Sequence, residues 1–363
     1  MSSSPSPDVP AFGVYLHVPF CAARCDYCAF ATWTDRHHLQ ERYLEACRLD
    51  VVRHVEAGMP PATSVFVGGG TPSLVDPARL VGVLAAIPLA DGAEVTVECN
   101  PDDVTPALVA AYAAGGVNRI SIGVQSMEGH VLAALGRGHD PDNVRSAVAA
   151  IRDGGIPTFN VDLIYGGAGE SLEDWRRTLS LALELGPPHV SAYGLTVEPG
   201  TGLADDPSRH PDDDDQADKY LMAASMLEGA GLAWYEISNW ARPGHECRHN
   251  RLYWSMGEYQ AFGCAGHSHR DGRRFWNVRT PERYLDAVLG GRSPEAAGER
   301  LAPPDRRLEA LQLAVRTRDG VPAAAFPPEE LDLLGPLVER HADRVVLTPE
   351  GRLLANEVAL RLA

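Results

Sequence analysis

The stretch YLHVPFCAARCDYCAF, residues 15–30, places three cysteines within eight positions, directly after a run that alternates like a β-strand. The three are Cys21, Cys25 and Cys28. Clustered cysteines at such short spacing are typical of metal ligands. A cubane iron–sulfur cluster suits this set, because three thiolates leave one iron open for another ligand. A structural zinc site needs four ligands, so zinc remains an alternative only if His37 or His38 supplies the fourth.

Charge and cysteine usage restrict the class of protein. The 363 residues carry 32 basic and 49 acidic side chains, 32 − 49 = −17, which argues against a broad nucleic-acid-binding face. The first ten residues, MSSSPSPDVP, lack the features of a secretory signal, and no apolar run is long enough to span a bilayer. Seven cysteines, an odd number, favour metal or redox chemistry in a reducing compartment. We therefore expect a cytoplasmic protein without nucleic-acid partners.

Six β-rich runs alternate with helical stretches along the first two thirds of the chain. This alternation predicts βα units with a parallel sheet, and six units fit a partial (β/α)6 TIM-like barrel better than a complete one. The acidic run DDDD at 212–215 is interpreted as a solvated first helical turn rather than a metal site. The predicted strands are 14–18, 64–68, 94–98, 119–124, 158–164 and 189–195. The predicted helices are 36–56, 77–86, 106–114, 141–153, 172–184 and 212–228.

Composition changes along the chain predict four regions. Residues 1–12 are expected to be disordered, 13–230 to form the barrel, and 231–303 to form an aromatic-rich connecting region. Residues 304–363 are expected to form a smaller appendage with helices at 306–317 and 329–339. The ending RVVLTPEGRLLANEVAL predicts a strand, a turn and a helix, which resembles a winged helix.

The cysteine spacing, with Tyr27 just before the third cysteine and a strand in front, resembles the radical S-adenosylmethionine (SAM) superfamily. VFVGGGTPS at 65–73 resembles that superfamily's glycine motif, whose backbone receives the SAM amino group. The resemblance implies a [4Fe–4S] cluster on the three cysteines and SAM as a second cofactor. The SAM-binding residues that it implies are Tyr15, Tyr27, Gly69, Gly70, Thr71, Glu98, Gln125, Arg137 and Asp162.

Physical reasoning supports the same set of residues. In parallel βα architectures, functional groups collect at the carboxyl ends of the strands. The cysteines follow the first predicted strand and the glycines follow the second, while Glu98 ends the third, Gln125 follows the fourth and Asp162 lies late in the fifth. Five consecutive units therefore direct polar or ligand groups to one mouth.

Further segments resemble the branch of the superfamily that contains oxygen-independent coproporphyrinogen III dehydrogenases and HemW-type heme chaperones. They are RISIGVQS at 119–126, GRGH at 136–139, NVDLIYG at 160–166 and SAYGLTVEPGT at 191–201. The dehydrogenases have a fourth cysteine where this chain has Phe30, and they have a longer N-terminal extension. YGGAGES at 165–171 departs from the branch's pattern, and Glu170 is expected to add charge near the mouth.

The segment HNRLYW, 249–254, resembles the HNxxYW signature of the chaperone type. An imidazole is a good axial ligand to heme iron, and aromatic side chains can stack on a porphyrin, so His249 is predicted to contact heme. Its nearby rivals are His245, Cys247, His267 and His269. The resemblance implies a heme chaperone with a heme-accepting partner protein. An electron donor, a transient membrane-protein acceptor and a homodimer stay open, as do two alternative activities, radical coproporphyrinogen III dehydrogenation and radical modification of RNA.

Overall fold

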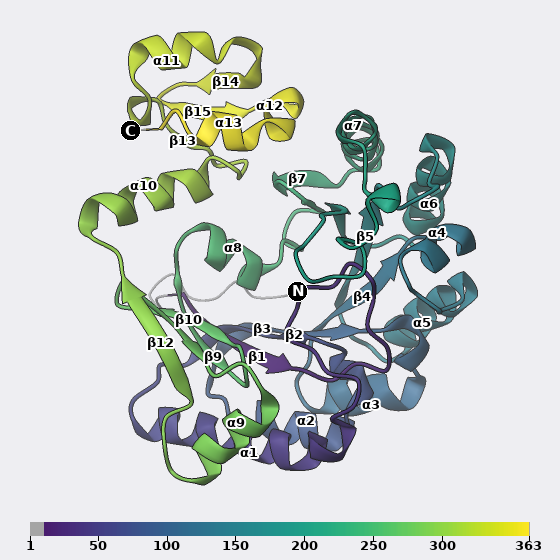
Figure 1. Ribbon diagram of the computed structural model, residues 1–363, viewed down its shortest axis with the longest axis vertical. Helices are drawn as coiled ribbons and strands as arrows, with labels where there is room; N and C mark the ends of the chain where they lie inside the picture. The colour runs from purple at the N-terminus through teal and green to yellow at the C-terminus, as the bar shows by residue number, and fades with distance from the viewer. Residues whose placement is uncertain (1–10, 363) are drawn as a thin grey trace.

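The computed structural model describes residues 11–362. Most of the segment expected to be disordered, 1–12, lies outside these residues, and Phe12 already begins the first strand. The fold is mixed α/β, as predicted, with one large sheet and a smaller C-terminal unit (Figure 1). Among the described helices, none has both the length and the apolar composition needed to cross a bilayer.

The large sheet has twelve strands, and its first six run parallel in chain order. These six are β1 (Phe12–Val18), β2 (Ala62–Gly69), β3 (Leu89–Cys99), β4 (Arg119–Gln125), β5 (Thr158–Tyr165) and β6 (His189–Gly194). The strands β8 (Asn239–Ala241) and β7 (Ala233–Glu236) extend it beyond β6. On the other side, the sheet continues through β9 (Glu258–Phe262), β10 (His267–Arg270), β11 (Arg273–Asn277) and β12 (Glu295–Arg300). Because the strand order ends at β12 and β7, the described sheet is not closed into a complete barrel.

Helices lie around the outside of the parallel strands (Figure 1). Aspartate or threonine caps the first turn of several of them. Asp212, for example, accepts a hydrogen bond from the Asp215 backbone N–H at 2.9 Å, which confirms the helical interpretation of the acidic run. The outer helices are α1 (Gln40–Glu56), α2 (Pro77–Leu84), α3 (Pro106–Ala114), α4 (Gly129–Ala134), α5 (Pro141–Asp153), α6 (Leu172–Glu184), α7 (Asp213–Gly229) and α9 (Pro281–Leu289). The helix α8 (Arg248–Trp254) instead contacts β1 and β2 and lines an interior cavity.

Alternation along the strands separates an apolar outer face from a polar inner one. On β1, Val14, Leu16 and Val18 are fully buried in the main apolar core, whereas Tyr15 and His17 point the other way. The strand register pairs Tyr15 with Phe66, so inward side chains of neighbouring strands lie at matching levels. The inner face thereby lines cavities instead of a solid core.

The C-terminal unit has its own small apolar core. The prediction of a helix over 329–339 is wrong in its second half, because the observed helix ends at Leu333. Gly335, with a φ of 48°, and Pro336 follow it and do not continue the helix. A strand follows there instead. The elements are α10 (Pro303–Ala314), β13 (Val321–Pro322), α11 (Pro328–Leu333), β14 (Val338–His341), β15 (Arg344–Leu347), α12 (Pro349–Leu353) and α13 (Ala355–Ala359), with the strands antiparallel in the order β13-β15-β14.

Candidate functional site

A cavity of about 480 Å³ opens at the carboxyl ends of the parallel strands, and we call it the mouth. It brings together the three cysteines and eight of the nine residues predicted to bind SAM. These are Cys21, Cys25, Cys28, Tyr27, Gly69, Gly70, Thr71, Glu98, Gln125, Arg137 and Asp162. His37 and His38 lie on the short 3-10 helix His37–Leu39 and do not line the mouth, so neither is placed to complete a zinc site with these cysteines.

The loop that carries the cysteines is tied to β1 by its own backbone. The Cys21 N–H donates to the Trp33 carbonyl at 3.1 Å, and the Trp33 N–H donates to the Pro19 carbonyl at 2.8 Å. The His17 imidazole Nε2 lies 2.9 Å from the Ala31 carbonyl. These bonds hold both ends of the loop, so the three thiols are presented to the mouth from a fixed base.

Glycines at the end of β2 allow the cysteine loop to approach closely. A Cβ at Gly69 would lie 2.5 Å from the His17 ring, and one at Gly70 would lie 2.6 Å from the Phe20 carbonyl oxygen. Gly69 also has a φ of 112°, which side chains strongly disfavour. The glycine motif is therefore a packing requirement of this turn, and it exposes backbone to the mouth.

The donor set fits an iron–sulfur cluster. Cys21, Cys25 and Cys28 are free thiols, and burial raises the pKa of Cys21 and Cys28, an effect that a bound metal would oppose by favouring the thiolates. Arg137 places its Nη1 3.7 Å from the Cys25 sulfur, where its charge complements a thiolate. Cys99 also lines the mouth, but its thiol is directed at the Val97 carbonyl, 3.8 Å away.

Two carboxylates form the floor of the mouth. Burial raises the pKa of Glu98 to about 8, and the nearby charge of Asp162 adds to the shift, while the Gly69 N–H, 3.2 Å away, opposes it. Burial also raises the pKa of Asp162, against the hydrogen bonds it accepts from Ser121 and Asn160, both at 2.7 Å. Such carboxylates favour a ligand that brings positive charge or hydroxyl donors.

Gln125 and Arg137 line the wall of the mouth. Gln125 has a φ of 64° at an irregularity in the β4–β5 pairing, a conformation that is rare for a side chain of this kind. Arg137 donates from Nη2 to the Gly123 carbonyl at 3.0 Å. With the guanidinium fixed by that bond, its other nitrogen faces the cysteines and the cavity.

The structure places Tyr15 and His249 one level below the mouth. Both line a cavity of about 140 Å³ in the interior of the sheet. Four residues line both cavities: Glu98, Ser121, Asp162 and Tyr193. Tyr15 comes three residues before the end of β1, which explains its depth. Its hydroxyl lies 3.2 Å from His17 Nδ1.

His249 is buried, and both of its ring nitrogens have partners. Nδ1 lies 3.0 Å from the Ser64 hydroxyl and Nε2 lies 2.8 Å from the Tyr253 hydroxyl. Burial lowers the pKa of His249 to about 3, so the imidazole is neutral near pH 7. Direct ligation of a metal by Nε2 would require the Tyr253 contact to open.

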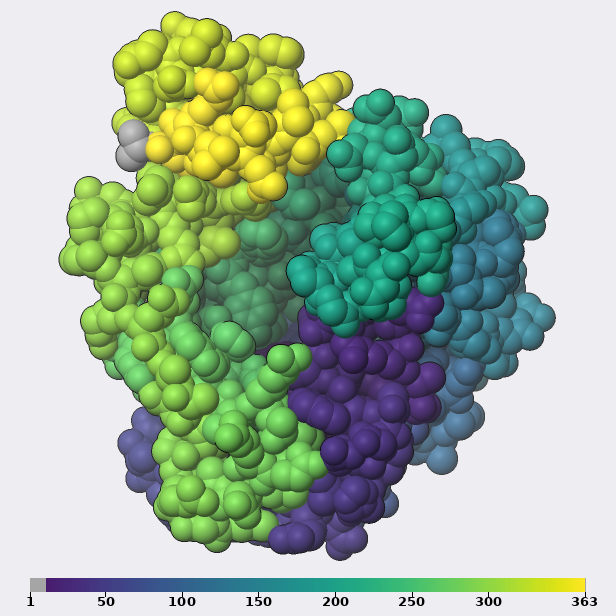
Figure 2. All heavy atoms as spheres, in the orientation of Figure 1, coloured from purple at the N-terminus to yellow at the C-terminus, as the bar shows by residue number. Residues whose placement is uncertain are grey.

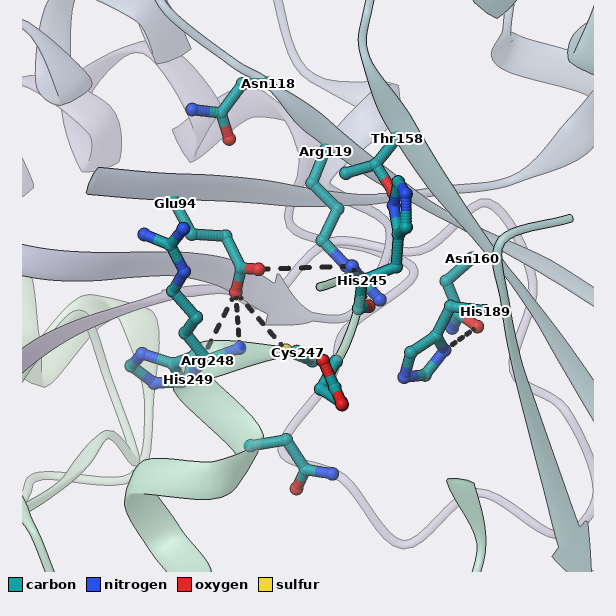
Figure 3. Close-up of polar contacts among 12 residues, drawn as sticks. Glu94, Asn118, Arg119, Thr158, Asn160, His189, His245, Cys247, Arg248 and His249 are labelled. Carbon is teal, nitrogen blue, oxygen red and sulfur yellow. Dashed lines mark hydrogen bonds and ion pairs between the residues drawn. The ribbon is translucent and has the colours of Figure 1, made fainter. Parts of the chain in front are cut away.

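Glu94 at the base of β3 fixes the helix that carries His249, and nothing in the local sequence indicates this contact. Its carboxylate accepts from the backbone N–H groups of Arg248, at 2.9 Å, and His249, at 3.4 Å, and from the Cys247 thiol at 3.5 Å (Figure 3). An acidic group at a helix N-terminus satisfies free N–H groups and complements the helix dipole. Arg119 lies 3.9 Å from the same carboxylate.

The rival ligands lie in different surroundings. Cys247 lines the lower cavity, whereas His245 contacts the Thr158 hydroxyl at 2.8 Å. His269 is buried with its Nδ1 2.9 Å from the Gly257 carbonyl. His267 is exposed on β10 and stacks on Trp276, with ring centroids 5.6 Å apart. None of these four lines the mouth.

Glu170 does not add charge to the mouth, contrary to expectation. Its side chain is fully buried, accepts from the Gly166 N–H at 2.7 Å and lies 3.2 Å from Lys219 Nζ on α7. Lys219 also pairs with Asp215 at 2.6 Å. A buried carboxylate needs such a cation, and the pair closes the loop after β5 onto α7.

The fold and the composition of the mouth define a radical SAM protein, and a family model described as Radical SAM superfamily matches residues 15–182. The chain is 41% identical to the heme chaperone HemW of Mycobacterium tuberculosis, over 99% of this chain and 96% of that one. It is 36% identical to the heme chaperone HemW of Escherichia coli, over 88% and 86%. The chain therefore belongs to the HemW heme chaperone family.

A solved structure of Escherichia coli coproporphyrinogen III oxidase (HemN), described as a radical SAM enzyme, is similar with a TM-score of 0.84. The similarity covers 97% of this chain and 89% of that one, at 20% sequence identity. At that identity the likeness shows the fold, which extends through the C-terminal unit.

Proposed function

We propose that the protein is a heme chaperone, which binds heme, a [4Fe–4S] cluster and SAM and passes heme to an acceptor protein. The observation that carries this proposal is the near-full-length relationship to proteins named heme chaperone HemW. Phe30, 67% exposed at the rim of the mouth, supports it, because that position holds a cysteine in the dehydrogenases that the sequence also resembles.

In this proposal Cys21, Cys25 and Cys28 hold the cluster, which when bound supplies an electron and an open iron site. The mouth then receives SAM. Glu98 and Asp162 face the positive groups and hydroxyls of that ligand, and the exposed backbone at Gly69 and Gly70 provides further contacts. Tyr27, Thr71, Gln125 and Arg137 complete the walls.

Heme contact is assigned to the region around α8. The HNxxYW segment predicts His249 as the heme contact, but its imidazole is held by Ser64 and Tyr253, so other side chains of α8 are better placed to meet heme. An acceptor protein is a necessary partner of any chaperone. An electron donor, a membrane-protein acceptor and a homodimer are compatible with the proposal.

One anaerobic experiment tests the chaperone against the dehydrogenase. Reconstituted protein should bind heme saturably at about one per chain, and it should leave coproporphyrinogen III unchanged with reduced cluster and excess SAM. Absorption titration measures heme, and chromatography measures porphyrinogen and 5′-deoxyadenosine. Porphyrinogen decarboxylation coupled to 5′-deoxyadenosine formation would establish the enzyme instead.

A further inference from the structure

A further cavity, of about 450 Å³, lies at the opposite ends of the strands from the mouth. Ser64 at the start of β2 and several side chains of α8 form one wall, and the segment 314–320 with Arg344 of the C-terminal unit forms the other. Figure 2 shows the surface hollowed below the C-terminal unit, with green segments at the bottom of the hollow. We call this cavity the arginine groove.

The arginine groove is cationic in a strongly acidic chain. Its lining has four arginines, Arg248, Arg251, Arg318 and Arg344, against two acidic residues, Glu236 and Asp319. Arg318 is also paired with Glu246, at 2.7 Å, so the formal charge of this group is 4 − 3 = +1. The whole chain carries −17. The groove therefore favours an anionic ligand.

The guanidinium groups of the groove retain donors for such a ligand. Arg251 lies 3.7 Å from its acidic neighbour Asp319, beyond hydrogen-bond distance, and more than half of its side chain is exposed. Arg344 uses Nε and one terminal nitrogen on the Asp319 and Gly320 carbonyls, at 2.6 Å each, which fixes the fork. With the guanidinium fixed by these two bonds, its other terminal nitrogen, Nη1, can donate to a carboxylate.

An aromatic surface accompanies the arginines. Trp254 lines the groove, and its buried indole N–H has no hydrogen-bond partner among the described residues. Leu252 and Ala314 add apolar surface. Arginines beside an indole and aliphatic groups suit a flat apolar ring that carries carboxylates at its edge.

We infer that heme binds in the arginine groove, with its two propionates on the arginines and its ring against Trp254. This inference rests on the proposed function and assigns the heme site within it. The mouth has the volume of a single ligand pocket, and the proposal already places the cluster and SAM there, so heme needs a separate site. The positive charge of the lining also favours the two carboxylates.

The groove contacts the propionates and the porphyrin ring of heme and does not ligate the heme iron. No histidine, cysteine or methionine occurs among the described residues that line it, and His249 lies behind Ser64. The iron therefore stays free of these ligands for the acceptor protein.

The test compares hemin with metal-free protoporphyrin IX on the reconstituted full-length chain. Both probes should bind with similar affinity, because the contacts are to the ring and the propionates. Arg251→Gln should weaken both by at least about tenfold, since it removes a charged hydrogen bond to a carboxylate. Arg48→Gln, which removes a surface arginine on α1 that is paired only locally with Glu45, is the matched control and should change neither. Iron content and SAM affinity report that each variant is folded.

Three results would overturn the inference. Hemin binding by Arg251→Gln at parental affinity excludes the groove and leaves the chaperone proposal intact. Binding of hemin without protoporphyrin IX shows that an iron ligand dominates, as a His249 site would. A parent chain that binds neither probe overturns both the groove and the proposed function.

Discussion

Glu98 should make SAM binding depend on pH in a way that can be calculated from the structure. Burial raises its pKa to about 8, so below about pH 8 the carboxyl group is protonated in the empty mouth. SAM carries a sulfonium and an ammonium group, and their positive charge favours the carboxylate. Binding in this range therefore releases a proton, and the apparent affinity falls as the pH drops.

The size of the effect follows from the fraction of ionised carboxylate. With a pKa of about 8, the dissociation constant rises by the factor 1 + 10^(8 − pH), which is about 30 at about pH 6.5 and near one at about pH 9. This factor assumes that bound SAM keeps Glu98 ionised throughout that range. It corresponds to about 2 kcal/mol of binding free energy at the lower pH.

Glu98→Gln supplies the control, because the ligand's own α-amino group also titrates, near about pH 8. Isothermal titration of reconstituted protein should show that the ratio of variant to parent dissociation constants shrinks by about 30-fold between about pH 9 and pH 6.5. Buffers of different ionisation enthalpy should report, near about pH 6.5, about one more released proton for the parent than for the variant. If the ratio stays constant across this range, Glu98 does not carry the titration and the reasoning fails.

The remaining predictions concern the cluster, the wall of the mouth and the loop after β5. Elemental analysis should find about four iron and four sulfide per chain in the reconstituted parent, and Cys25→Ala should abolish this uptake. Cys47→Ala is the control and should keep it, because that thiol is buried outside the mouth. Stoichiometric zinc without sulfide in the parent would refute the cluster. Arg137→Ala should weaken SAM binding at least about tenfold by calorimetry at unchanged iron content, and parental affinity would remove it from the site. Glu170→Ala removes a buried partner of Lys219 and should lower the free energy of unfolding, measured in urea, by about 3 kcal/mol. A decrease of less than about 1 kcal/mol would contradict a stabilising role of the buried pair.

The parallel strands and most of the mouth could be predicted from the sequence because both depend on local patterns. Apolar alternation and capping residues define the six βα units, and the carboxyl end of each strand has a known place in such a sheet. The strands β7 to β12 were not predicted. They are short, and β12, EAAGER, is exposed at every residue, so no alternation marks it.

Contacts between distant segments could not be read from the sequence. Glu94 and Arg248 are 154 positions apart, and only the fold brings the carboxylate to the helix N-terminus. Lys219 likewise lies 49 positions from Glu170, so the sequence does not show that this carboxylate is paired inside the protein instead of adding charge near the mouth. The depth of Tyr15 and His249 depends on the level at which strand and helix meet, which no motif specifies.

The polar interior of the sheet follows from strand alternation, and it determines how ligands act on this fold. A packed barrel carries branched apolar side chains inside. Here the inward positions of β4 and β5 hold Arg119, Ser121, Asn160 and Asp162. The alternate positions of β4, Ile120 and Ile122, belong to the apolar core.

Such an interior disfavours charge, as the raised pKa of Asp162 and the lowered pKa of His249 both show. The free energy that is lost by burying these ionisable groups is offset by the burial of apolar side chains on the outer face of the sheet. A cationic ligand above Asp162 relieves part of that cost, so it binds the folded chain selectively and stabilises it by mass action. The same carboxylate also borders the lower cavity, so substitutions at Asp162 alter the surroundings of both cavities at once. No described residue lines both the mouth and the arginine groove, so under the two proposals Arg137→Ala should alter SAM binding alone and Arg251→Gln should alter heme binding alone.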